Sequence, residues 1–261
     1  MRAATHPASP SEYDRTRRAD PFITSRLLHH LRHAPSGRYV ELGCGTGNYT
    51  QAMARAGGWW VGADVSWPMV EAARAKEADV EWCVADVRAL ALRTASFDGA
   101  VCSLALHYFK DLVIAFAEAR RVLARGRLVL FTATPEQMRG YWLNEYFPKT
   151  MERATAGMPT LSTVNQALVG ASFRVLLVEP YEVRADLQDY FLYSGKHDPA
   201  RYLDGRVRAG MSAFSVHGNE EEIERGCRRL AADVASGRAA SVAARYRSAL
   251  GDYIFVVAEA N

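Results

Sequence analysis

Residues 38–48, RYVELGCGTGN, decide the fold. The first five form a short apolar run with the character of a buried strand, and three glycines follow in alternate positions, Gly43, Gly45 and Gly47. Glycine lets the backbone turn sharply and approach a ligand without a clash from a Cβ atom. Residues 48–56 then have the pattern of a helix. The stretch therefore predicts a strand, a glycine-rich turn and a helix in immediate succession.

The unit of strand and helix repeats along the chain after this turn. Seven strands are expected in all, at residues 38–42, 59–64, 80–85, 97–106, 127–132, 173–183 and 252–258. Strands that alternate with helices predict βαβ units, in which helices cover both faces of a parallel sheet. We therefore expect an α/β protein built on a seven-stranded, mostly parallel sheet.

The alternation of strands and helices ends after the fifth expected strand. Residues 135–159 are aromatic-rich and irregular, and residues 185–250 form a polar helical stretch between the last two strands. An insertion of that length is expected to pack as a helical cap over the carboxyl edge of the sheet. No segment rich in Pro or Ser separates independent domains. The expected division is an N-terminal helical lid (1–36), a core (37–184 and 251–261) and the cap (185–250).

Asp64 ends the second expected strand, 17 residues after Gly47. An acid in this place accepts hydrogen bonds from a ribose diol. The dinucleotide fingerprint also requires a third glycine for close packing of the helix, and Asn48 stands at that place. The turn therefore fits an NAD-dependent oxidoreductase poorly.

The pattern Glu41-x-Gly43-x-Gly45-x-Gly47 resembles motif I of the class I S-adenosylmethionine (SAM)-dependent methyltransferases. The resemblance runs from about Tyr39 to Thr134 and includes the last strand. It implies a Rossmann-like class I methyltransferase fold with SAM bound over the glycine turn. The residues that it places around SAM are Tyr13, Glu41, Gly43, Gly45, Asn48, Asp64, Val65, Asp86, Val87 and Ser103.

The same resemblance assigns parts of SAM to particular residues. Asp64 corresponds to the ribose-binding acid, and Asp86 resembles the acid that meets the adenine ring. Ser103 ends the strand that borders the reactive sulfonium. Tyr13 resembles a lid tyrosine that closes over the methionine moiety of SAM. An intact set of acids argues against a degenerate, non-catalytic scaffold.

Methyl transfer from a sulfonium is an in-line displacement, so the protein chiefly aligns and desolvates the two partners. A sulfonium cation is attracted to aromatic faces. The candidates for a sulfonium or substrate pocket are Tyr108, Tyr141, Trp142 and Tyr146, with Tyr181 as a further aromatic partner. His107 follows the fourth strand, and a histidine can take a proton from a hydroxyl or amine nucleophile near neutral pH.

Two reactions remain open for such a site. One is methyl transfer to a small acceptor of secondary metabolism, held beneath the cap. The other is cyclisation of SAM itself, in which the α-amine attacks the γ-carbon and yields azetidine-2-carboxylate and methylthioadenosine. The aromatic segment around Asn144, together with Tyr181, resembles the azetidine-2-carboxylate synthases, and this resemblance implies that Asn144 orients the amine while Tyr181 holds the sulfonium. Methyl transfer is the preferred prediction.

Sequence motifs of other methyl acceptors are missing. Ser103 is followed by Leu-Ala-Leu-His and not by the Asn/Asp-Pro-Pro-Tyr/Phe motif of base and amide N-methylation. The chain contains no Pro-Cys pair for cytosine C5 methylation and no acidic cluster that resembles a magnesium site. We therefore expect a small-molecule substrate, with SAM as the only cofactor and no metal.

Composition limits the partners and the compartment. Lys and Arg number 32 against 29 Asp and Glu, a net charge of +3, which is not the signature of a nucleic-acid-binding protein. No run approaches 18 apolar residues, and no signal peptide is evident. The four cysteines, Cys44, Cys83, Cys102 and Cys227, lack zinc or disulfide spacing. We predict a cytoplasmic monomer or homodimer that contacts neither nucleic acid nor membrane.

Overall fold

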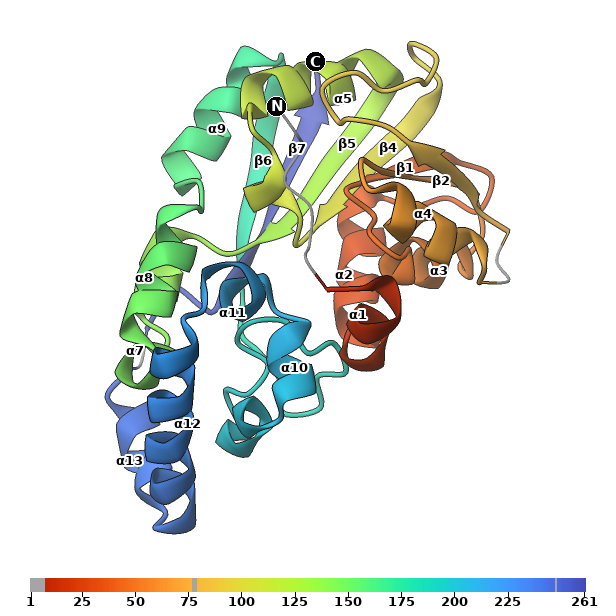
Figure 1. The fold of residues 1–261 in the computed structure, drawn as a ribbon. Coiled ribbons are helices and arrows are strands. Elements are labelled where there is room, and N and C mark those ends of the chain that lie inside the picture. Colours follow the sequence, from red (N-terminus) through yellow and green to blue (C-terminus); the bar gives the residue numbers. More distant parts are fainter. Residues whose placement is uncertain (1–7, 77–78, 247) are drawn as a thin grey trace.

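The computed structural model describes residues 8–76, 79–246 and 248–261 (Figure 1). Its centre is a seven-stranded sheet in the order β3-β2-β1-β4-β5-β7-β6. The strands are β1 (Arg38–Leu42), β2 (Trp59–Asp64), β3 (Glu81–Val84), β4 (Phe97–Ser103), β5 (Leu123–Thr132), β6 (Phe173–Tyr181) and β7 (Tyr253–Ala260). All neighbours are parallel except that β7 runs antiparallel to both β5 and β6. The prediction of a seven-stranded, mostly parallel sheet is confirmed.

Helices cover both faces of this sheet. Those before the sheet and between its first strands are α1 (Pro10–Thr16), α2 (Pro21–Leu31), α3 (Asn48–Ala54), α4 (Trp67–Arg74) and α5 (Leu112–Val122), with a 3-10 turn η1 at Leu106–Tyr108. After β5 come α6 (Pro135–Arg139), α7 (Leu143–Tyr146), α8 (Pro148–Ala156) and α9 (Leu161–Gly170). Between β6 and β7 lie η2 (Pro199–Leu203), α10 (Gly205–Ala209), α11 (Ser212–His217), α12 (Glu220–Ala235) and α13 (Arg238–Ala244).

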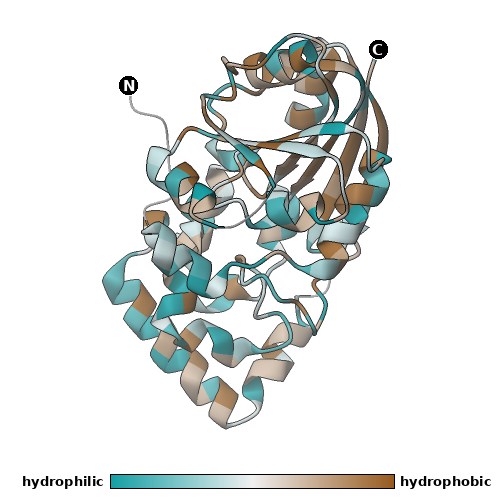
Figure 2. Cartoon of the chain, turned by 90° about the vertical axis from the view of Figure 1, so that its right-hand side faces the viewer, coloured by the Kyte–Doolittle hydropathy of each residue, from teal (hydrophilic) through white to brown (hydrophobic). Residues whose placement is uncertain are grey.

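Alternation along β1 divides the core between the two faces. Tyr39 packs with Trp60 in one buried cluster, whereas Val40 and Leu42 belong to a second cluster with Phe116 of α5. Successive side chains of a strand point to opposite faces of the sheet. Both sets are buried here, as expected for a parallel sheet with helices on both faces. Figure 2 shows the strands as mostly hydrophobic, while the helices at the opposite end of the molecule alternate between polar and apolar residues.

The glycine turn between β1 and α3 has the backbone that its sequence predicts. Gly43, Gly45 and Gly47 all have positive φ angles, of 72°, 54° and 76°. A Cβ atom at Gly47 would also lie 2.1 Å from the Trp82 ring, so this position needs glycine for two reasons.

Residues 135–159 are not irregular, which corrects the expectation from sequence. They form α6, α7 and α8, and the Thr134 hydroxyl together with Gln137 makes a capping box at the start of α6. The rings of Phe147 and Phe214 of α11 meet edge to face at 5.0 Å, so these helices pack on the insertion that follows β6. The cap is thus built from two insertions and not from residues 185–250 alone.

The N-terminal segment likewise divides into two parts. α2 belongs to the core, since Ile23 and Leu27 are fully buried in the same cluster as Phe131 and Phe255. Only α1 and the turn after it lie over the carboxyl ends of the strands (Figure 1). The lid is therefore shorter than residues 1–36, of which 1–7 lie outside the described part of the chain.

Candidate functional site

A pocket opens at the carboxyl ends of β1, β2 and β4, directly over the glycine turn. The strand order of the sheet reverses between β1 and β4, and open α/β sheets bind their ligands at such a switch point. Ten residues were predicted from sequence to surround SAM, and all ten line this pocket: Tyr13, Glu41, Gly43, Gly45, Asn48, Asp64, Val65, Asp86, Val87 and Ser103. His107 and Tyr108 line it as well.

Asp64 organises the turn from the end of β2. Its Oδ2 accepts a hydrogen bond of 2.8 Å from the Gly45 amide, and its Oδ1 accepts one of 2.8 Å from the Ser66 amide. Burial raises the pKa of Asp64, whereas these backbone hydrogen bonds lower it. A carboxylate has about four acceptor positions, so both oxygens can still accept hydrogen bonds from a diol in the pocket.

Glu41 lies in β1 beneath the turn and is only 2% exposed. The Thr50 hydroxyl, from α3, donates a hydrogen bond of 2.5 Å to its Oε2. Burial raises the pKa of Glu41 to about 7, although the hydrogen bond from Thr50 acts in the opposite direction. A cationic group bound nearby would favour the ionised form of this carboxyl group.

Asp86 lies at the rim of the pocket, after β3, and is paired with Arg88. Nη2 of Arg88 lies 2.6 Å from Oδ2 of Asp86, and the Arg88 backbone amide donates to Oδ1 at 2.9 Å. The side-chain hydrogen bond from Arg88 holds the pKa of Asp86 below its usual range. The acid that was predicted to meet an adenine ring therefore stays ionised and already has one partner.

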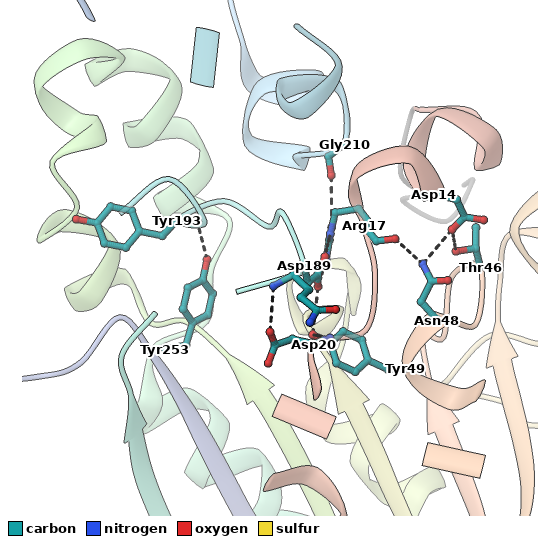
Figure 3. A network of polar contacts seen from close by, with 11 residues as sticks. Asp14, Arg17, Asp20, Thr46, Asn48, Tyr49, Asp189, Tyr193, Gly210 and Tyr253 are labelled. Carbon is teal, nitrogen blue, oxygen red and sulfur yellow. Dashed lines mark hydrogen bonds and ion pairs between the residues drawn. The ribbon is translucent and has the colours of Figure 1, made fainter. Parts of the chain in front are cut away.

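A group of polar contacts that the sequence did not reveal ties α1 to the glycine turn (Figure 3). Oδ1 of Asp14 accepts hydrogen bonds from the Thr46 hydroxyl at 2.5 Å and from the Asn48 amide at 2.9 Å. The Lys76 ammonium lies 2.8 Å from Oδ2 of Asp14 and also donates to Oδ1 of Asn48. Asn48 thus fastens the lid to the turn through its side chain.

A buried ion pair joins the same lid to the cap (Figure 3). Arg17 Nε lies 2.5 Å from Oδ1 of Asp189, and Nη2 donates to Oδ2 at 3.2 Å. The Tyr49 hydroxyl donates to the same carboxylate at 3.2 Å, and Arg17 Nη1 donates to the Gly210 carbonyl at 3.4 Å. Both members of the pair line the pocket, and their side chains are only 10% and 1% exposed. We call this pair the Arg17–Asp189 latch.

The end of the pocket beyond β4 carries groups that can transfer a proton. His107 lies in η1, and its Nε2 is 3.4 Å from the hydroxyl of Ser212, at the start of α11 in the cap. Both side chains line the pocket. A histidine in this position can accept a proton from a nucleophile that is bound beside Ser103.

Comparisons with known proteins agree with this geometry. The Methyltransferase domain family matches residues 40–131. A solved structure from Anabaena variabilis, described as a methyltransferase from an antibiotic biosynthesis pathway, superposes with a TM-score of 0.83 at 29% identity, over 92% of this chain and 98% of that one. Residues 40–131 therefore form a methyltransferase domain, on the fold of the class I SAM-dependent methyltransferases.

Curated relatives of this methyltransferase match over a shorter segment. The malonyl-[acyl-carrier protein] O-methyltransferase of Erwinia pyrifoliae is 40% identical over 112 residues, which is 42% of this chain and 42% of that relative. The geranyl diphosphate C-methyltransferase of Streptomyces coelicolor, solved with S-adenosyl-L-homocysteine, covers 92% of this chain and 76% of its own at a TM-score of 0.58 and 14% identity. The second likeness shows the fold alone.

Four residues of the predicted aromatic segment do not line the pocket of this methyltransferase. The side-chain amide of Asn144 in α7 donates to the carbonyls of Met138 in α6 and of Tyr141 in the connection between the two helices, at 2.8 and 2.7 Å. The Tyr141 ring stacks on Tyr193 at 3.9 Å. Trp142 and Tyr146 meet edge to face, and the Tyr146 hydroxyl donates to Asp233 of α12. These side chains pack the two insertions together, which corrects the prediction of an aromatic cage around a sulfonium.

Tyr181 also lies away from the pocket. It ends β6, the edge strand, and three strands separate it from β1. Its ring packs edge to face against Phe131 at 5.4 Å, and burial raises the pKa of its phenol. The prediction that Tyr181 holds the sulfonium does not fit this arrangement. Of the predicted aromatic group, only Tyr108 reaches the pocket.

Over 8–76, 79–246 and 248–261, no three His, Cys, Asp or Glu side chains gather in a way that could hold a metal ion. Within those same ranges, every helix is too short or too polar to cross a lipid bilayer.

Proposed function

We propose that this methyltransferase transfers the methyl group of SAM to a small acceptor by in-line displacement. The observation that carries the proposal is the pocket at the switch point, because it gathers the ten residues that the resemblance in sequence assigns to SAM. The O-methyltransferase activity named for the Erwinia relative and the S-adenosyl-L-homocysteine in the Streptomyces structure support it.

In this proposal each part of SAM has a partner in the pocket. Asp64 accepts hydrogen bonds from the ribose diol, and Val65 and Val87 contact the adenine. Glu41 faces the α-amino group, and Tyr13 closes over the methionine moiety from α1. The methyl group then points along the end of β4, towards Tyr108 and His107. The latch excludes water on the side of the cap, which strengthens the electrostatic interactions inside the pocket.

We further propose that the reaction belongs to the secondary metabolism of small molecules in the cytoplasm. The pathway described for the Anabaena protein supports the first part. All four cysteines are unpaired, as suits a reducing compartment. His107 is proposed as the group that takes the proton of the acceptor, and the protein acts as a monomer or homodimer.

Cyclisation of SAM to azetidine-2-carboxylate is the second candidate. One observation favours it: Tyr141, Trp142 and Tyr146 pack on neighbouring rings outside the SAM pocket, so they form no wall for a second substrate in that pocket. A reaction with SAM as the only substrate needs no such wall. The positions of Asn144 and Tyr181 oppose this candidate, because neither residue lines the pocket.

Incubating the purified protein with SAM, first alone and then with pools of small carboxylic acids, phenols and amines, separates the candidates. Mass spectrometry then identifies the products. We expect S-adenosylhomocysteine only when an acceptor is present. If SAM alone yields azetidine-2-carboxylate and methylthioadenosine, the protein is the cyclase and methyl transfer is refuted. Absence of SAM binding by calorimetry would refute both.

A further inference from the structure

A second depression adjoins the SAM pocket on the side of α5. It lies between residues 106–113, which connect β4 to α5, and residues 157–167, which connect α8 to α9 and begin α9. In Figure 1, α8 and α9 run along the left side of the molecule, and α9 lies beside the edge strand β6. We call this depression the acceptor groove.

The acceptor groove and the SAM pocket share three lining residues, His107, Phe109 and Lys110. These three lie in one short turn directly after β4, the strand whose end borders the methyl group in the proposed function. A molecule in the groove would therefore have one end at the same turn that the methyl group faces.

The lining of the groove indicates the chemistry of its occupant. Its walls are mainly apolar, with Leu106, Phe109 and Leu112 on one side, and Met158 on the other side together with the polar Thr163 and Gln166. The basic side chains of His107 and Lys110 also line the SAM pocket and so lie at that end of the groove, and Asp111 is an acidic lining residue beside them. Such a groove suits an elongated molecule with an apolar body and one polar end.

Another cavity lies in the cap, between residues 193–199 and α13. It is lined by Trp142, Tyr193 and several alanines of α13, and it shares no lining residue with the SAM pocket. A molecule bound in this cavity would lie beside the Tyr141–Tyr193 stack, away from the residues that line the SAM pocket. The acceptor groove is the better candidate because of its common boundary with the pocket.

We propose that the acceptor groove binds the methyl acceptor, an elongated molecule whose apolar body lies between the β4–α5 connection and α9. This inference rests on the proposed function. The hydroxyl or carboxyl oxygen at the polar end of the acceptor forms a bond to the methyl carbon as the bond from that carbon to sulfur breaks. The electron pair of the broken bond stays on sulfur, which gives S-adenosylhomocysteine. A hydroxyl proton, where present, passes to His107.

The test uses two SAM analogues, so it needs no knowledge of the acceptor. In both, a tertiary amine replaces the sulfonium; one carries a methyl group and the other a hexyl chain. Calorimetry measures the two affinities for the wild-type protein, for Gln166→Trp and Thr163→Trp, which crowd the groove, and for Val169→Trp. Val169 is a matched control, since it lies on the same helix, is 64% exposed and does not line the groove.

We expect the wild-type protein to bind the hexyl analogue at least as tightly as the methyl analogue, because each methylene that leaves water contributes about fourfold. Gln166→Trp and Thr163→Trp should each lower the affinity for the hexyl analogue by about tenfold or more and leave the affinity for the methyl analogue unchanged. Val169→Trp should change neither.

Two results would overturn the proposal. One is a hexyl analogue that binds the wild-type protein far more weakly than the methyl analogue, since the turn would then be a closed wall between pocket and groove. The other is a ratio of the hexyl-analogue affinity to the methyl-analogue affinity that is the same in Gln166→Trp and Thr163→Trp as in the wild-type protein. Failure of the methyl analogue to bind at all would instead refute the proposed function itself.

Discussion

Asp64 holds the two peptide groups that shape the pocket, Gly45 and Ser66, and it is also the residue proposed to bind the ribose. Asp64→Ala should therefore lose ligand hydrogen bonds and loosen the turn together. Hydrogen bonds to a charged group contribute about 1.5–3 kcal/mol each, so we expect the affinity for S-adenosylhomocysteine to fall by about 100-fold. Calorimetry measures this loss. Asp186→Ala, an exposed acid outside the pocket, is the control, and an unchanged affinity of Asp64→Ala would refute the assignment.

Glu41 makes the stability of the folded protein depend on pH, and the direction of the change can be predicted. Its pKa is raised to about 7 in the folded chain, from an ordinary value of 4.5, because burial disfavours the charge. The folded state therefore holds a proton that the unfolded state has released, and this group makes the protein less stable as pH rises from about 4.5 to about 7. Glu41→Gln removes the titration and keeps the shape.

The thermal unfolding midpoints of both proteins at pH 5 and pH 8 test this sign. We expect Glu41→Gln to gain stability relative to the wild type on going from pH 5 to pH 8. A constant difference between the two proteins at both pH values would show that Glu41 titrates normally in the folded state. The comparison is made without ligand, since a bound ammonium group would favour the ionised form.

At the scale of elements, the local parts of this fold could be predicted from sequence. Strand β1, the glycine turn and α3 follow from neighbouring residues, because an apolar run and glycines with positive φ need no distant partner. The position of Glu41, Asp64 and Ser103 around one pocket could be predicted from the resemblance and from the geometry of parallel strands, whose carboxyl ends meet at one edge.

The aromatic segment of α7 and α8 could not be assigned in the same way. Large aromatic side chains suit a cation cage and the packing of two helical layers equally well, and composition alone cannot separate these uses. Tyr146 and Phe147 are buried against α12 and α11, which are more than 60 residues away along the chain. Their role depends on how the second insertion folds back, and no local pattern encodes that.

At the scale of the whole molecule, the N-terminal segment connects the two parts that surround the pocket. Asp14 holds α1 to the glycine turn, and Arg17 holds the next residues to the cap. Asp189 lies 172 residues from Arg17, so no sequence motif could reveal the pair. The Thr16 carbonyl also accepts a hydrogen bond from the Tyr190 amide, which extends the contact into the backbone. The cap and the core are therefore expected to unfold together.

The latch makes this coupling measurable. Asp189→Ala leaves the Arg17 guanidinium buried without its carboxylate, and breaking a buried pair in this way costs about 3–5 kcal/mol. Replacing both partners, in Arg17→Met with Asp189→Leu, removes the uncompensated charge and should restore much of the loss. Urea unfolding measures each free energy of unfolding.

Arg184→Met, which breaks the exposed pair with Asp186, is the control and should change the free energy of unfolding by less than about 1 kcal/mol. A double variant no more stable than Asp189→Ala would mean that water reaches the guanidinium, and that the latch does not couple the lid to the cap.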